Sequence, residues 1–125
     1  MTVRIATSLF ALCLATAAAL PASAAEQALT GAEIQTLLSG NSVHGTWAST
    51  DYWSYFAADG VTLYRTDRGV DRGQWRVKGD RYCSTWAQSG ESCYRLARDG
   101  NQLIWLTDEG KRYPSSLISG KAAGF

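Results

Sequence analysis

Residues 73–107 read GQWRVKGDRYCSTWAQSGESCYRLARDGNQLIWLT, and this stretch decides the fold. Apolar and polar side chains alternate along it, which is the period of a β-strand with one buried face. Short glycine-containing turns interrupt the alternation at Gly79-Asp80, Ser89-Gly90 and Asp99-Gly100. Glycine accepts the positive φ that tight hairpin turns need. The stretch therefore predicts strands at residues 73–78, 81–86, 92–98 and 103–107, joined as successive hairpins.

The same pattern extends in both directions along the chain. Further strands are expected at residues 43–49, 52–57 and 61–66, with a short one at 111–113 and one helical turn at 115–118. Strands joined by tight turns pair antiparallel with their neighbours in sequence. The predicted fold is mainly β, an antiparallel up-and-down meander. Seven or eight such strands do not stay flat, so we expect a small barrel or a half-barrel.

One short helix is expected ahead of the strands, at residues 31–39. Thr30 and Glu33 have the spacing of a capping box, in which each side chain accepts a hydrogen bond from the other residue's backbone N–H. Ile34, Leu37 and Leu38 form an apolar stripe on one side of this helix, and the glycine at position 40 ends it. We expect the helix to cover one open end of the barrel.

The first 24 residues have the features of a cleavable secretory signal peptide. Arg4 supplies a positive charge, an apolar run follows, and Ala22-Ser23-Ala24 offers small side chains for cleavage after Ala24. Cys13 lies inside this leader. Cleavage leaves residues 25–125 as a single domain, long enough for one modest core. We therefore expect a periplasmic or secreted protein.

Two cysteines remain in that domain, Cys83 and Cys93. They flank the Ser89-Gly90 turn, and a hairpin centred on Gln88 places them opposite each other. Because exported proteins meet an oxidising compartment, we expect a disulfide that staples the hairpin. Closing a loop of about ten residues stabilises a fold by roughly 2–3 kcal/mol.

The charge balance excludes several classes of partner. The chain has 12 Lys and Arg and 11 Asp and Glu, and loss of Arg4 with the leader makes the two counts equal. Such a domain has no positive surplus to neutralise phosphates, so nucleic acid is not the expected partner. Attachment to an anionic membrane is not expected either. No apolar run after the leader approaches a membrane span in length.

The sequence carries no pattern that indicates catalysis. His44 is the single histidine, and Gly-x-Ser-x-Gly, a Gly-rich phosphate loop and a dinucleotide fingerprint are all missing from the sequence. A zinc site needs several His or Cys ligands, whereas both remaining cysteines are expected in the disulfide. We therefore expect no enzymatic activity, no cofactor and no metal.

Gly45-Thr46-Trp47, directly after the expected helix, resembles the Gly-x-Trp entry motif of lipocalins and their calycin relatives. Gly73-Gln74-Trp75 repeats the motif on a later strand. The resemblance implies a barrel whose bottom is plugged by Trp47, with a basic residue, Lys111 or Arg112, packed over that ring. Some calycins are protein inhibitors.

The wider spacing resembles a family of small secreted proteins of unknown function, found mainly in alphaproteobacteria. The residues that carry this resemblance are the capped helix, Phe56-x-x-Asp59-Gly60, Gly73-x-Trp75-x-Val77, the two cysteines and a late Asp-Glu-Gly. The resemblance implies an exported β domain and supplies no activity.

Four residues are expected to be structural: the cap pair Thr30 and Glu33, and the buried rings Trp47 and Trp75. Arg76 and Lys78 alternate with the apolar positions and should lie on a mixed-charge outer face. Aromatic residues occupy both faces of the strand at 52–57, so one set is expected to be exposed unless the helix or the tail covers it. The candidate partner-binding residues are Tyr52, Trp53, Tyr55, Arg68 and Arg72.

The sequence thus favours a non-catalytic binding protein. The partner is either a small apolar ligand inside the barrel or a protein target bound by the rim loops, as in calycin-type inhibitors. A structural or envelope-interaction protein without a ligand is the alternative.

Overall fold

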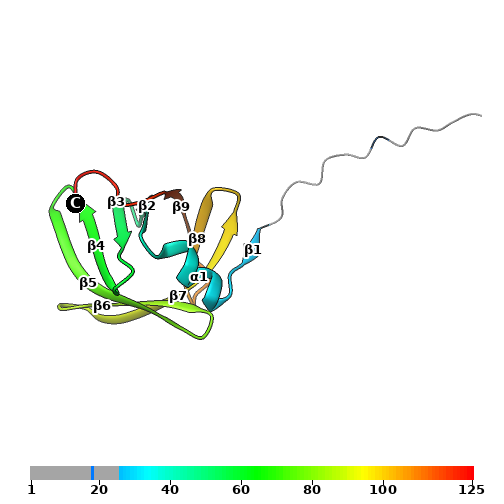
Figure 1. The fold of residues 1–125 in the computed structure, drawn as a ribbon, viewed down its shortest axis with the longest axis horizontal. Helices are drawn as coiled ribbons and strands as arrows, with labels where there is room; N and C mark the ends of the chain where they lie inside the picture. The colour runs from blue at the N-terminus through cyan, green and yellow to red at the C-terminus, as the bar shows by residue number, and fades with distance from the viewer. Residues whose placement is uncertain (1–17, 19–25) are drawn as a thin grey trace, which may run out of the picture.

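The computed structural model describes residues 26–125 and residue 18, so the expected signal peptide otherwise lies outside the described residues. Strands β2 to β9 form a closed antiparallel barrel, and one short helix precedes it (Figure 1). The elements in chain order are β1 (Gln27–Ala28), α1 (Gly31–Leu38), β2 (Asn41–Trp47), β3 (Thr50–Phe56), β4 (Val61–Thr66), β5 (Gly69–Lys78), β6 (Arg81–Trp86), β7 (Gly90–Asp99), β8 (Gln102–Leu106) and β9 (Arg112–Ile118).

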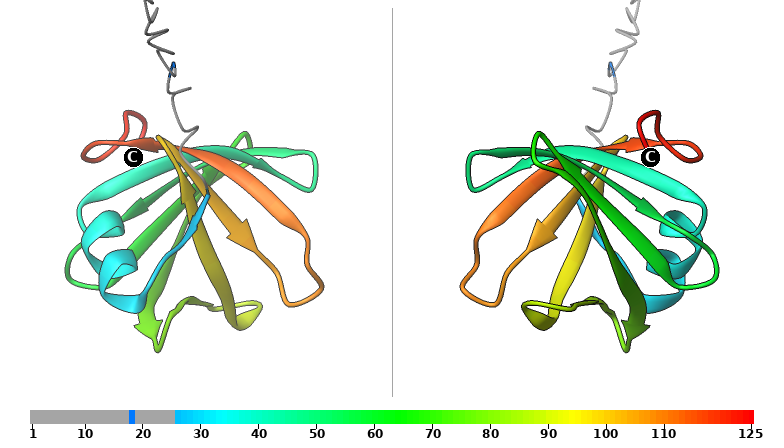
Figure 2. Two further views of the ribbon diagram at one scale, coloured as in Figure 1. Left: turned by 90° about the vertical axis from the view of Figure 1, so that its right-hand side faces the viewer. Right: turned by 90° about the vertical axis from the view of Figure 1, so that its left-hand side faces the viewer.

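Each barrel strand pairs antiparallel with its neighbours in sequence, which confirms the up-and-down meander. The last strand then returns to the first, because β9 pairs with β2 through registers such as Val43 opposite Leu117. This pairing makes a closed barrel rather than a half-barrel (Figure 2). The two-residue strand β1 adds to β7, with Gln27 opposite Arg98.

The end of the chain differs from the sequence expectation. Residues 111–118 were expected to give a short strand and one helical turn, whereas Arg112–Ile118 form the full strand β9. Ser115 lies inside the barrel wall, where its Oγ donates to the Leu103 carbonyl and accepts from the Trp105 indole. Pairing on both sides, with β2 and β8, outweighs the weak strand preference of this serine-rich segment.

Helix α1 has the expected cap. The Thr30 backbone N–H donates to the Glu33 carboxylate at 2.8 Å, and the Glu33 N–H donates back to the Thr30 hydroxyl at 3.3 Å. Ile34 and Leu38 are fully buried in the barrel core. The Gly31 N–H donates to the Asp80 carboxylate at 2.7 Å, which places the start of the helix on the β5–β6 turn. The helix therefore covers one end of the barrel, as expected.

Aromatic rings fill the middle of the barrel. Phe56 contacts Trp75, Tyr82 and Trp105 edge-on or tilted, with ring centroids 5.6–6.1 Å apart. Trp75 is 5% exposed, and its indole N–H donates to the Ala57 carbonyl at 2.9 Å. The expectation that Trp75 is a buried structural residue is confirmed.

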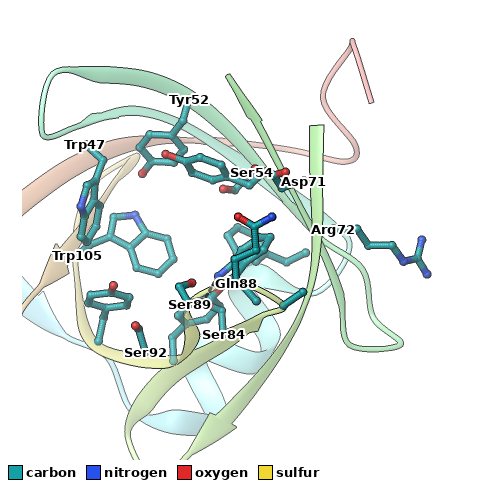
Figure 3. A pocket seen from close by; sticks show the side chains of 16 residues that line it. Trp47, Tyr52, Ser54, Asp71, Arg72, Ser84, Gln88, Ser89, Ser92 and Trp105 are labelled. Atoms are coloured by element: carbon teal, nitrogen blue, oxygen red, sulfur yellow. Dashed lines mark hydrogen bonds between the residues drawn. The ribbon is translucent and has the colours of Figure 1, made fainter. Parts of the chain in front are cut away.

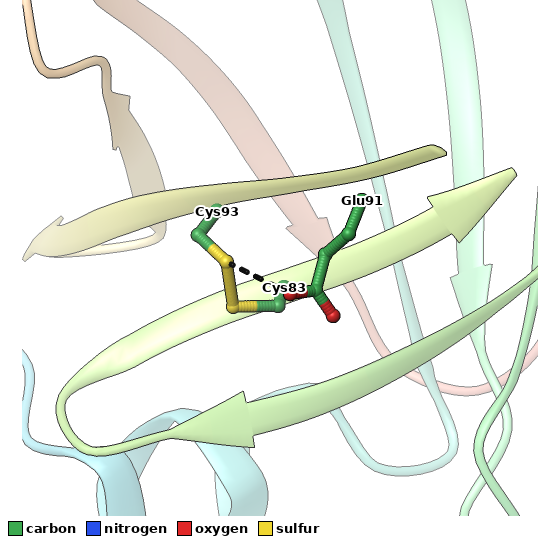
Figure 4. A group of neighbouring side chains, drawn as sticks. All are labelled: Cys83, Glu91 and Cys93. Carbon is green, nitrogen blue, oxygen red and sulfur yellow. Dashed lines mark hydrogen bonds between the residues drawn. A yellow bond between two sulfur atoms is a disulfide. The ribbon is translucent and has the colours of Figure 1, made fainter. Parts of the chain in front are cut away.

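The disulfide between Cys83 and Cys93 is present (Figure 4). The two residues lie directly opposite each other on β6 and β7, in the register that centres the turn on Gln88. Both side chains alternate with inward-facing neighbours, so the staple lies on the outer side of the barrel wall. Beside it, Glu91 binds Arg76 at 2.7 Å and Lys78 at 3.0 Å, which gives the expected mixed-charge outer face.

Within the described residues, no helix is both long enough and apolar enough to cross a membrane.

Gly31→Ala is expected to lower the free energy of unfolding by about 3 kcal/mol, because a new side chain forces overpacking. A Cβ at Gly31 would lie 2.0 Å from the Gly79 carbonyl oxygen, so the helix must move away from the β5–β6 turn. Urea unfolding followed by circular dichroism measures the change.

Thr30→Ala serves as the comparison, because it removes only the cap and should cost about 1 kcal/mol. Equal urea midpoints for Gly31→Ala and wild type would show that α1 does not depend on this close approach.

Candidate functional site

A cavity of about 510 Å³ lies inside the barrel and opens at the end opposite α1 (Figure 3). Strand β6 shows the two ends: it begins beside Gly79 and Asp80, under the helix, and ends at Trp86, in the cavity wall. The β6–β7 turn, Ala87 to Ser89, forms part of the mouth. The aromatic residues of the lining are Trp47, Tyr52, Phe56, Tyr64, Tyr82, Trp86, Tyr94 and Trp105.

The alternation of each strand aims these rings inward. On β3, Tyr52, Ser54 and Phe56 are buried and line the cavity, whereas Trp53 and Tyr55 lie on the other face and are half-buried. On β6, Tyr82, Ser84 and Trp86 line the cavity in the same way. The barrel thus collects alternate residues of many strands into one aromatic wall.

The rings of the wall support one another near the mouth. Trp47 stacks on Tyr113, with centroids 4.0 Å apart, and meets Tyr94 edge-on at 5.2 Å. On the adjacent strands β3 and β4, Tyr52 stacks on Tyr64 with ring centroids 5.2 Å apart. Such contacts hold the rings in fixed orientations. The orientation of these rings is therefore set by the fold itself.

Two indole N–H groups of the wall already have partners within the barrel. The Trp86 N–H donates to the Ser84 hydroxyl at 3.0 Å, and the Trp105 N–H donates to the Ser115 hydroxyl at 3.1 Å. Because both donors are satisfied, these residues offer their ring surfaces to the cavity rather than hydrogen bonds.

Burial keeps the phenols of the wall neutral. Burial raises the pKa of Tyr82 and of Tyr52 well above the ordinary tyrosine value. Burial also raises the pKa of Tyr64, and the negative charge of the Asp71 carboxylate adds to that effect. A desolvated phenol favours its uncharged form, so these hydroxyls stay protonated in neutral solution.

Asp71 and Arg72 are neighbours on β5 but lie on its two sides (Figure 3). The Asp71 side chain lies on the cavity side, where β4 places Tyr64 opposite it. The Arg72 side chain points away from the cavity. Of these two charged residues, Asp71 thus faces the cavity.

The candidate partner-binding residues do not form one surface. Tyr52 is 3% exposed and lies inside the barrel, so its expected place on a free outer surface is wrong. Trp53 lies between the His44 ring at 4.2 Å and the Arg65 guanidinium at 4.2 Å. Tyr55 lies near Phe125, with centroids 6.3 Å apart. Arg68 and Arg72 are exposed.

The C-terminal segment covers the outer aromatic residues. The Ala122 N–H donates to the Ser42 hydroxyl at 2.9 Å, and the Arg65 guanidinium donates to the Ala123 carbonyl at 3.1 Å. The Lys121 ammonium lies 5.5 Å from the Tyr55 ring centroid. The alternative expectation, that the tail covers one aromatic set, is therefore confirmed for Tyr55, whereas His44 and Arg65 cover Trp53.

Trp47 does not occupy the place that the resemblance to calycins implies. It is half-buried at the far end of β2 and lines the open cavity, whereas the barrel end under α1 holds Ile34 and Leu38. Tyr113, rather than a basic side chain, stacks on its ring. Arg112 is paired instead with Glu26.

Two clusters of side chains that could be considered for metal binding or catalysis lie outside the cavity. The ligand atoms of Cys83, Glu91 and Cys93 lie within 4.8 Å of one another, but the sulfurs are bonded to each other and are not thiolates that bind a metal. His44 accepts or donates a bond to Asp51 at 2.8 Å on the outer face, away from the cavity. The expectation of no catalysis stays a prediction.

No known protein family, curated protein or solved structure matches this chain. The closed antiparallel barrel is compatible with a lipocalin-like fold, and the class that the structure defines is an eight-stranded antiparallel barrel with an internal cavity.

Sequence reasoning missed most of the cavity wall, including Asp71, Tyr64, Trp86, Tyr94 and Trp105. The alternation placed Trp86 and Tyr94 on the same face as the barrel core, which was the available signal. The alternation does not give the height of each ring along the barrel axis, because this height depends on the stagger between strands.

Tyr52 and Tyr82 are expected to ionise well above the ordinary tyrosine pKa of about 10, because burial disfavours the phenolate. The folded protein then holds protons that the unfolded chain releases, so the free energy of unfolding should fall as pH rises above about 10. Tyrosinate absorbance in the near ultraviolet measures this, with the chain in urea as the reference. Coincident folded and unfolded titration curves would contradict the burial of these phenols.

Proposed function

We propose that this protein is a non-catalytic binding protein that holds a small, mainly apolar ligand inside its barrel, in the periplasm or after secretion. The observation that carries the proposal is the open cavity of about 510 Å³ with its aromatic wall. Ligand sites in proteins typically measure roughly 300–1,000 Å³ and are lined by apolar and aromatic residues with a few polar groups.

The packing of the wall supports a ligand rather than an unfinished core. The closed end under α1 is filled by fully buried aliphatic side chains, among them Ile34, Leu38 and Leu103. The other end leaves the half-buried rings of Trp47, Trp86 and Tyr94 around an open space. Aromatic surface of this kind is stabilised when an apolar partner displaces water from it.

A protein target bound at the rim is the second candidate. Val70 is 48% exposed at the β4–β5 hairpin and lies between Arg68 and Arg72 in the sequence. Apolar and arginine side chains together are common at protein interfaces. Two contacts weaken this candidate in part, because the tail covers Tyr55 and Arg65 covers Trp53. A structural role without a ligand leaves the open aromatic cavity without a use.

The test is direct binding of the neutral fluorescent probe N-phenyl-1-naphthylamine to the mature protein. Wild type should enhance and shift the probe's emission, with a dissociation constant of about 1–100 µM for a ligand of this size. Ser92→Phe should abolish the effect, because Ser92 lines the cavity and a ring there occupies its space.

Thr85→Phe is the matched control, since Thr85 is exposed on the neighbouring strand β6 and lies on the outer side of the wall. It should bind the probe as wild type does. Absence of binding to wild type, or equal loss in both variants, would rule out the cavity as the binding site.

A further inference from the structure

We propose that the ligand of this cavity is an organic cation, an ammonium group attached to an apolar or aromatic body. The proposal rests on the function proposed above and names the class of ligand. It is based on the carboxylate of Asp71, which lies in the cavity wall together with aromatic rings.

The two charged residues of the cavity lining differ in whether they face the cavity. Among the residues that line it, the charged ones are Asp71 and Arg72. Asp71 lies on the cavity side of β5, whereas the Arg72 side chain points away (Figure 3). The charge that the wall presents to a ligand is therefore negative.

Asp71 has no competing cation in the described part of the chain. The ion pairs found there involve other acids, and Arg76 and Lys78 both bind Glu91 on the outer face. Arg81 binds Asp108. A bound cation would thus meet an exposed carboxylate that forms no ion pair with the described side chains, which favours it over a neutral ligand.

Aromatic rings stand next to that carboxylate. Tyr64 lies directly opposite Asp71 on the neighbouring strand, and Trp86 meets Tyr64 edge-on with centroids 6.1 Å apart. The electron-rich face of a tryptophan or tyrosine attracts an ammonium group. Asp71, Tyr64 and Trp86 therefore form a corner suited to the charged end of a ligand, and the remaining rings suit its apolar body.

Gly73 fixes the Trp86 ring in this corner. A Cβ at Gly73 would lie 2.7 Å from the Trp86 ring carbon Cε3, so the ring rests directly on the backbone of β5. The Trp86 N–H is held by Ser84. The ring is thus positioned from two sides before any ligand arrives.

The test measures the binding of three probes by isothermal titration calorimetry. Benzyltrimethylammonium is a cation, and neopentylbenzene is a neutral compound of the same shape. Phenylmethanesulfonate serves as the anionic probe. Wild type should bind the cation about 10-fold more tightly than the neutral compound, and the anion most weakly.

Asp71→Asn should remove most of the preference for the cation, and a circular dichroism spectrum equal to that of wild type shows that the variant is folded. Asp67→Asn is the matched control, because it removes an exposed carboxylate from the same hairpin without changing the cavity wall. It should retain the preference.

The outcomes separate the two proposals. Equal binding of the cation and the neutral compound to wild type, or equal effects of Asp71→Asn and Asp67→Asn, would overturn the cation proposal while binding in the cavity stands. If wild type binds neither the neutral fluorescent probe nor any of the three compounds, the proposed function itself fails. Cation binding that Ser92→Phe abolishes and Asp71→Asn weakens supports both.

Discussion

The pairing of β2 with β9 is the constraint on which the rest of the structure depends. It joins the first barrel strand to the last and leaves the barrel strands without an open edge, which protects a β protein from pairing with other chains. The two strands approach closely, because a Cβ at Gly45 would lie 3.0 Å from the Pro114 carbonyl oxygen. Closure also gives the barrel an interior, so alternate side chains of every strand point into the same space.

The two ends of the barrel interior differ in how they are filled. Helix α1 and its aliphatic side chains Ile34 and Leu38 fill one end, where the Asp80 carboxylate holds the start of the helix. At the other end, large rings such as Trp47 and Trp86 line the wall without meeting in the middle. The filled end provides the rigidity, and the open end leaves the cavity.

Local sequence patterns predicted the parts of the fold that depend on neighbours in sequence. The Thr30 and Glu33 cap and the opposition of Cys83 to Cys93 follow from spacing alone. Strand β9 was missed because its pairing partners on both sides, not the Pro-Ser-Ser segment itself, make it a strand. The cavity was missed because periodicity gives the face of each ring but not its level along the barrel axis. The resemblance to calycins supplied a level for Trp47, at the closed end, and the structure places this ring in the wall of the open cavity instead.

The tail that crosses the β2–β9 seam has a consequence for the order of assembly. The Ser42 hydroxyl, on the first barrel strand, donates to the Gly120 carbonyl at 2.8 Å and accepts from the Ala122 N–H, so this strand is fastened by residues 78 and 80 positions later in the chain. Contacts so distant in sequence form late and slow the folding of a β protein. The β6–β7 hairpin needs only local contacts and can form early, whereas the closed and fastened barrel requires strand β9 and the tail residues to reach β2.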